Sequence, residues 1–230
     1  MRKVALLSLV AVLAACGGSS SSGSSALSGT IGGTPFTAST ELALFGTGNA
    51  CNISLAAGIP LGVSMAVTGL TSATTTCTEA LTCVTHKNSQ VVSLIIAKAN
   101  LTTGTAPGLA VGTYQFIDLA TLATNPPTFA PDSNGNIAIF IADVTGLNAT
   151  CLPTPTAGYT VTSGSLNVTA VTATSVTGTV SLTLGNGQGS VSGTFTASGC
   201  GVPAFDACAA LNGITSGGGL DTCTGTPTCI

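Results

Sequence analysis

Short stretches in which apolar and hydroxyl-bearing residues alternate recur along the chain from about residue 26 onward. The clearest lie at 166–170, 176–184 and 191–197, where Val, Leu, Phe or Ala alternates with Thr, Ser or Asn. Successive side chains of a β-strand point to opposite faces of a sheet, so this alternation predicts three strands with one buried and one solvated face. The glycine-rich residues 185–189 predict a hairpin turn between the second and the third.

Two other stretches, 91–98 and 136–144, are apolar at both alternating sets of positions. Such a pattern is typical of a strand that is buried on both faces. Further candidate strands are separated by glycine-rich turns and lie at 26–31, 40–45, 51–56, 63–70 and 112–117. The pattern therefore predicts an all-β fold, an antiparallel β-sandwich or Greek-key domain spanning residues 26–200.

After residue 200 the alternation stops. Residues 204–212 could form one short helix, with Asp206 in its first turn and Gly213 past its end. The remaining residues to 230 are mostly glycine, threonine and cysteine. We expect residues 201–230 to form a loose, cysteine-rich C-terminal appendix to the β domain.

The first 25 residues differ from the rest. Arg2 and Lys3 precede an apolar run at 4–12, which is a length typical of an export signal. The sequence Leu-Ala-Ala-Cys that ends at Cys16 resembles the lipobox of bacterial lipoproteins. That resemblance implies removal of a signal peptide, residues 1–15, and acylation of Cys16 as a lipid anchor. Gly17, rather than Asp, implies sorting to the outer membrane.

Residues 16–25 contain only Cys16 and a run of glycine and serine, so we expect a lipid-anchored flexible linker with a reach of roughly 15–18 Å. The alternative is an ordinary secreted protein that is cut after Ala15, in which Cys16 is a spare thiol. The linker would separate the β domain from the membrane.

Charge excludes one class of partner. After removal of the signal, two lysines face seven carboxylates, which leaves a net charge of −5. Nucleic-acid binding depends on neutralising a phosphate backbone, so it is not expected. No segment after the signal reaches the roughly 18 apolar residues that a membrane-spanning helix needs.

Besides Cys16, the chain has an even number of cysteines, which in an exported protein predicts disulfides. The candidates are Cys51, Cys77, Cys83, Cys151, Cys200, Cys208, Cys223 and Cys229. Eight cysteines allow 105 full pairings. Close spacing favours local loops at 77–83 and 223–229, whereas Cys151 and Cys200 could join sheet edges. None of the spacings is typical of zinc ligands, so we expect disulfide-stapled loops and no metal.

Candidate catalytic chemistry is sparse. His86 is the only histidine and lies among Thr, Lys and Asn, which favours a solvated loop residue over a catalytic base. The carboxylates are scattered singly. Residues 132–136 resemble the start of a calcium loop, but the expected glycine is out of place and no glutamate closes it, so a turn is favoured. We therefore expect no catalytic residues, no cofactor and no enzyme.

The chain resembles the small bacterial lipoproteins of unknown function that combine a lipobox with a Gly/Thr-rich β domain. We expect a non-enzymatic, lipid-anchored cell-envelope protein with a structural or binding role. Its contacts would be the membrane, through acylated Cys16, and an envelope protein or polysaccharide. The alternative function is a polysaccharide-binding or surface-adhesion module, in which threonine-rich strands present a flat array of hydroxyls.

Overall fold

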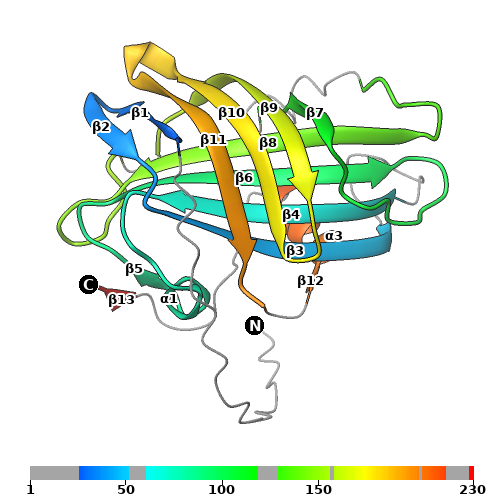
Figure 1. Ribbon diagram of the computed structural model, residues 1–230, viewed down its shortest axis with the longest axis horizontal. Helices are drawn as coiled ribbons and strands as arrows, with labels where there is room; N and C mark the ends of the chain where they lie inside the picture. Colours follow the sequence, from blue (N-terminus) through cyan, green and yellow to red (C-terminus); the bar gives the residue numbers. More distant parts are fainter. Residues whose placement is uncertain (1–25, 52–60, 119–128, 156–157, 202–203, 216–227) are drawn as a thin grey trace, which may run out of the picture.

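The structure is a computed structural model that describes residues 26–51, 61–118, 129–155, 158–201, 204–215 and 228–230 (Figure 1). Within these residues, neighbouring strands pair into a closed barrel. Its eight strands, in order around the barrel, are β3 (Thr40–Cys51), β4 (Leu61–Thr71), β6 (Gln90–Asn100), β8 (Asn136–Gly146), β7 (Gly112–Phe116), β9 (Val161–Val171), β10 (Ser175–Leu184) and β11 (Gly189–Gly199). The prediction of an all-β fold is confirmed, but the antiparallel β-sandwich or Greek-key domain is wrong.

Two parallel contacts close the barrel and make the sheet mixed. β7 pairs with β8 through Gln115 and Ile139, and the end of β11 pairs with β3 through Ser198 and Leu42. The two contacts join the eight strands into a closed ring. Alternation in sequence predicts which face of a strand is buried, and this is the same in a sandwich and a barrel. It does not specify which strands pair, whether they are far apart in sequence, as β11 and β3 are, or consecutive, as β7 and β8 are.

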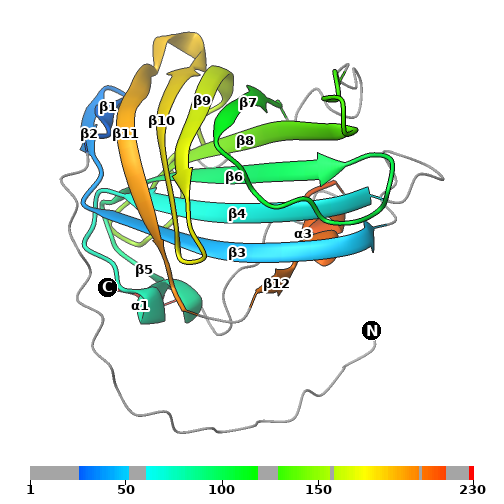
Figure 2. The ribbon, with the colours of Figure 1, turned by 45° about the vertical axis from the view of Figure 1, so that its right-hand side comes forward.

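The barrel has two walls that cross one another (Figures 1 and 2). β3, β4, β6 and β8 form the first wall, and β9, β10 and β11 run across it as the second. The hairpin of β1 (Ser28–Ile31) and β2 (Thr34–Thr37) extends the second wall from the first half of β11. Phe36, Phe140 and Phe195 are fully buried and belong to the cluster that fills the interior. The barrel therefore encloses a packed core.

The outer faces of the two walls differ in polarity. On the second wall the exposed positions carry hydroxyl or amide groups at Ser163, Ser165, Asn167, Thr169, Thr179, Ser181, Thr183, Ser190, Ser192, Thr194 and Thr196. This confirms the predicted solvated face. On the first wall, Val63, Met65 and Ala97 are buried in a second cluster outside the barrel. β4 and β6 are therefore buried on both faces near these residues, which confirms the prediction for part of 91–98; on the outer face Val91 and Ile95 are only partly buried.

Helix α3 (Ala207–Thr215) covers part of this outer face. Ala207 is fully buried, and Leu211 packs against the same cluster as Val63 and Met65. The carboxylate of Asp206, in the short strand β12 (Phe205–Asp206), accepts hydrogen bonds from the backbone N–H groups of residues 208 and 209 and so caps the helix. The helix starts later than predicted and continues through Gly213. This part of the C-terminal segment is packed rather than loose.

Three disulfides join segments that are far apart in sequence. The bonded pairs are Cys51–Cys208, Cys77–Cys200 and Cys151–Cys229. Cys83 is disulfide-bonded as well. The predicted local loop between Cys77 and Cys83 is wrong, because Cys77 is bonded to Cys200, and the loop between Cys223 and Cys229 is wrong because Cys229 is bonded to Cys151. Close spacing in sequence therefore did not determine which cysteines are bonded to each other. Cys16 and Cys223 lie outside the described residues.

Two predicted turns are confirmed. A single 3-10 turn, η2 (Gly185–Gly187), joins β10 to β11. In the loop before β8, the carboxylate of Asp132 accepts hydrogen bonds from the N–H groups of Asn134 (2.8 Å) and Asn136 (2.9 Å). The backbone hydrogen bond from Asn136, followed by the one from Asn134, holds the pKa of Asp132 below its usual value.

We predict that Phe195→Ala destabilises the protein by about 3–5 kcal/mol, because it removes a ring from the interior and leaves a cavity. The neighbouring Thr194→Ala, on the exposed face of the same strand, should change stability by no more than about 0.5 kcal/mol. Denaturant unfolding of both variants measures the difference. Similar costs at the two positions would contradict the assigned faces of β11.

Candidate functional site

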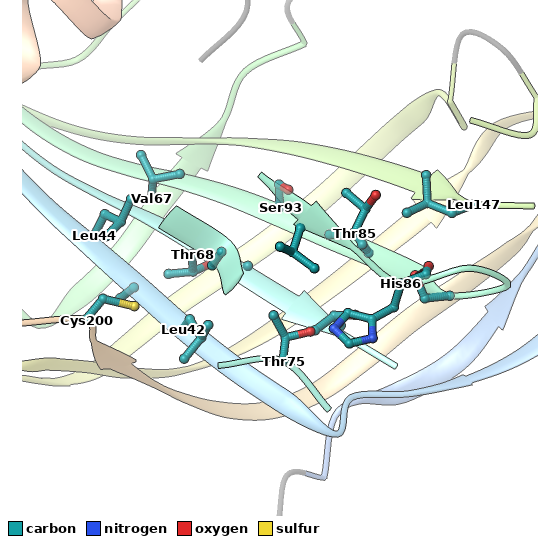
Figure 3. Close-up of a pocket in the computed structure, with 17 residues that line it drawn as sticks. Leu42, Leu44, Val67, Thr68, Thr75, Thr85, His86, Ser93, Leu147 and Cys200 are labelled. Carbon is teal, nitrogen blue, oxygen red and sulfur yellow. Dashed lines mark hydrogen bonds between the residues drawn. The ribbon is translucent and has the colours of Figure 1, made fainter. Parts of the chain in front are cut away.

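A pocket of about 200 Å³ lies on the outer face of the first wall, where α3 does not cover it (Figure 3). Its floor is formed by β3, β4 and β6. Its roof is the cap segment, residues 72–89, which connects β4 to β6 across the outer face. The lining is mostly apolar and includes Leu42, Leu44, Val67 and Val91. The pocket thus lies where the apolar outer face of the first wall is only partly covered.

The centre of the floor is a row of three paired residues. Leu42 of β3 lies opposite Gly69 of β4, which lies opposite Ser93 of β6. A Cβ atom added to Gly69 would meet no atom within 4 Å. Glycine weakens a strand interior, and no neighbouring backbone approaches closely enough here to require it. The absence of a side chain at position 69 therefore leaves room above the floor.

The cap segment is closed at its base. The backbone N–H of Ser72 donates to the carbonyl of Gln90 (2.9 Å), and the backbone N–H of Gln90 donates to the hydroxyl of Ser72 (2.9 Å). Between these ends the segment contains α1 (Cys77–Leu81) and β5 (Val84–Thr85). Ala80 of α1 and Val84 of β5 face the pocket as part of its lining.

Covalent and backbone contacts hold the cap segment in place. Helix α1 has only five residues, none of them buried, so neither helix propensity nor a large apolar face stabilises it. Its first residue, Cys77, is bonded to Cys200 at the end of the second wall. β5 pairs in parallel with β13 (Thr228–Cys229), and Cys229 is bonded to Cys151. The roof therefore depends on these two disulfides, on the disulfide bond of Cys83 and on a short strand from the C-terminal segment.

The charge of the pocket is low. None of the described residues that line it is Asp, Glu, Lys or Arg, and its polar groups are hydroxyls, backbone groups and the ring of His86. The carboxylates at positions 41, 118, 132, 143 and 206 are described but do not line the pocket. Asp221 lies outside the described residues. The arrangement can bury an uncharged molecule.

His86 lies at one end of the pocket, close to Thr75 (Figure 3). Its side chain is 21% exposed, and its Nε2 atom is buried without a hydrogen-bond partner. The nearest carboxylate oxygen, Oε2 of Glu79, is 3.8 Å from this nitrogen. His86 lies in a loop, as expected, but it is partly buried rather than fully solvated. The polar residues around it in sequence concealed a position between the cap segment and the floor.

Glu79 is held by the start of its own helix. Its carboxylate accepts hydrogen bonds from the backbone N–H (2.7 Å) and the hydroxyl (2.9 Å) of Thr76, and the Thr76 hydroxyl accepts from the Glu79 N–H (3.2 Å). This is a reciprocal capping box. The backbone hydrogen bond from Thr76, followed by its side-chain bond, lowers the pKa of Glu79 from its usual value, and His86 adds a smaller effect.

The fold and this pocket define a closed β-barrel with an external pocket whose described lining carries no Asp, Glu, Lys or Arg. No protein-family model, curated protein or solved structure matches the chain. In the described part of the chain, no helix has both the length and the apolar character needed to cross a membrane. Nor do three or more His, Cys, Asp or Glu side chains gather there as a metal site.

We predict that Thr76→Ala raises the pKa of Glu79 part of the way toward that of an unperturbed glutamate, because the hydrogen bond that the Thr76 hydroxyl donates to the carboxylate is lost, whereas the backbone N–H of residue 76 still donates to it. The pKa of Glu79 is lowered in the folded state. The contribution of this cap to folding stability is therefore present above the unfolded-state pKa, and it is lost as pH falls through the folded-state pKa. Carboxyl NMR titration measures the change. Thr78→Ala, two residues further along the chain, serves as the control and should leave the titration of Glu79 unaltered.

Proposed function

We propose that the protein is a lipid-anchored cell-envelope protein that acts by binding a small uncharged molecule rather than by catalysis. The pocket over Gly69 is the observation that carries this proposal. The lipobox that ends at Cys16 supports the anchor, and Gly17 supports an outer-membrane location. In this proposal, the serine and glycine linker separates the membrane from a rigid, disulfide-bonded receptor.

The pocket supports binding on energetic grounds. Burial of apolar surface contributes roughly 25 cal/mol per Å², and the floor offers Leu42, Leu44 and Val67 for such contact. These side chains are only partly exposed, so a ligand would complete their burial. The roof is tethered before a ligand arrives, which reduces the entropy that binding must remove.

Gly69 in the floor of the pocket is the second observation that supports the proposed binding function. A valine at position 69 would suit a strand better, and the open space above it would admit the side chain. Folding stability alone therefore gives no reason for glycine at this position. Keeping the floor open for a ligand is a reason that fits both the strand geometry and the volume of the pocket.

We predict that Gly69→Val abolishes binding of toluene, a small apolar probe, and raises the free energy of unfolding by about 0.5–1 kcal/mol. The added side chain fills the pocket and also restrains the unfolded chain. Amide chemical-shift changes in a toluene titration measure binding, and denaturant unfolding measures stability. In the unaltered protein, toluene should shift the amides of β3, β4 and β6 around the pocket.

Gly108→Val is the matched control. A Cβ atom at Gly108 also meets open space, but this residue does not line the pocket. This variant should bind toluene as the unaltered protein does. Absence of toluene binding to the unaltered protein, or undiminished binding to Gly69→Val, would show that the pocket is not a binding site.

We also predict that Cys16→Ala releases the protein from the membrane fraction, because a stable tether needs several acyl chains on one residue. Fractionation of cells that make each form measures the distribution. Mass spectrometry of the N-terminal peptide checks the modification directly. An unmodified Cys16 in the mature protein would contradict the anchor.

A polysaccharide-binding module is the second candidate function, favoured by the uncharged hydroxyl face of β9, β10 and β11. Cross-strand pairs such as Thr179 with Thr194 and Ser181 with Ser192 repeat along it. Sugars that bind to flat surfaces commonly stack on aromatic rings, and the exposed positions of this face carry none. Glycan-array binding that persists in Gly69→Val would support this candidate over the pocket.

A further inference from the structure

We infer that the pocket selects neutral, mostly apolar molecules that carry a single hydrogen-bonding oxygen, and that Ser93 makes the hydrogen bond to that oxygen. This inference rests on the proposed binding function and adds the chemical class of the ligand. It follows from the volume of the pocket, from its lack of charge and from the one hydroxyl at the centre of its floor.

The volume sets the size of the buried part of the ligand. An apolar protein cavity of about 150 Å³ holds one benzene molecule. By proportion, the pocket of about 200 Å³ accommodates about eight non-hydrogen atoms. A substituted benzene ring or a branched alkyl group has this size. A disaccharide or a nucleotide is too large to be enclosed.

The lack of charge excludes ionised ligands. A carboxylate transferred into the pocket would lose its hydration without meeting a lysine or arginine, since neither lines the pocket. The carboxylate nearest to the pocket residue His86 is Glu79, which would repel an anion. A cation would likewise meet no lining carboxylate. A neutral ligand avoids both costs.

Ser93 interrupts an apolar row. Its neighbours on the outer face of β6 are Val91 and Ile95, and across the sheet it lies opposite Gly69 of β4 on one side and Asp143 of β8, which does not line the pocket, on the other. The side chain is partly exposed, and Figure 3 shows its oxygen between the two ends of the pocket. No hydrogen bond joins its hydroxyl to another described residue. A hydroxyl at this place can donate to, or accept from, a ligand that rests on the glycine.

Most other hydroxyls that line the pocket are already engaged. Thr68 donates to the carbonyl of Leu94, Ser89 donates to the carbonyl of His86, Thr71 accepts from the N–H of Ala73, and Thr85 donates to the carbonyl of Thr228. Thr75 lies in the cap segment beside His86, at the edge of the pocket. Ser93 is therefore the floor hydroxyl that is positioned to contact a ligand.

Four probes of similar shape test the inference at pH 7. They are toluene, which has no oxygen, p-cresol, which adds one neutral hydroxyl, 4-methylbenzoate, which adds a negative charge, and 4-methylbenzamide, which is its neutral control. One hydrogen bond contributes about 0.5–1.5 kcal/mol net, so p-cresol should bind about 2- to 10-fold more tightly than toluene. 4-Methylbenzoate should bind at least about 10-fold more weakly than 4-methylbenzamide, a neutral molecule with the same number of non-hydrogen atoms, because the charge of the carboxylate is left unpaired.

Ser93→Ala removes the hydroxyl and little else. In this variant p-cresol should no longer bind more tightly than toluene, while the dissociation constant of toluene changes by less than about 2-fold. Thr75→Val is the matched control, because it replaces the hydroxyl at the edge of the pocket by a methyl group of similar size. It should leave the preference for p-cresol intact. Amide chemical-shift titrations give all the constants and report the fold of each variant.

Each outcome separates this inference from the proposed function. Equal binding of toluene and p-cresol overturns the inference and leaves the pocket as a binding site. Loss of the preference in Thr75→Val but not in Ser93→Ala overturns the role of Ser93. Tightest binding of 4-methylbenzoate overturns the requirement for a neutral ligand. Failure of every probe to bind overturns the proposed function itself.

Discussion

The structure depends on covering a wall of strands that is apolar on both faces. Inside the barrel, Leu94 and Ile96 of β6 pack against the second wall, and outside it Ala97 packs in the cluster that α3 covers. A single sheet cannot bury both faces, so additional segments must cover the outside. The C-terminal helix does this at one end. The cap segment does it incompletely at the other, and the candidate site lies in that gap.

The sequence predicted the strands better than their assembly. Alternation at 176–184 and 191–197 correctly assigned the buried and solvated faces of β10 and β11. It could not distinguish a sandwich from a barrel, because closure depends on two short parallel contacts, and alternation within a strand does not specify its pairing partners. The cysteines illustrate the same limit. Cys77 and Cys83 are neighbours in sequence, but the bond of Cys77 is to Cys200, 123 residues away.

The candidate site was harder to predict than the fold. Gly69 interrupts an apolar strand, and an unexplained glycine in such a place was the available signal. Ser93 interrupts the next strand in the same way, but only the register between β4 and β6 brings the two together. His86 appeared solvated because its sequence neighbours are polar. Its burial comes from the path of the cap segment across the wall, which local composition does not specify.

The attachment of β5 to β13 has a consequence for how the protein matures. The floor of the pocket is made from residues 42–93, yet its roof is anchored by residues 228 and 229. β13 and β5 form a separate two-stranded sheet, and none of the eight barrel strands includes residues 228 and 229. The barrel can therefore close whether or not the roof of the pocket is attached. Ligand binding thus reports that β13 has paired and that the Cys151–Cys229 disulfide has formed. A measurement of overall β content does not report this.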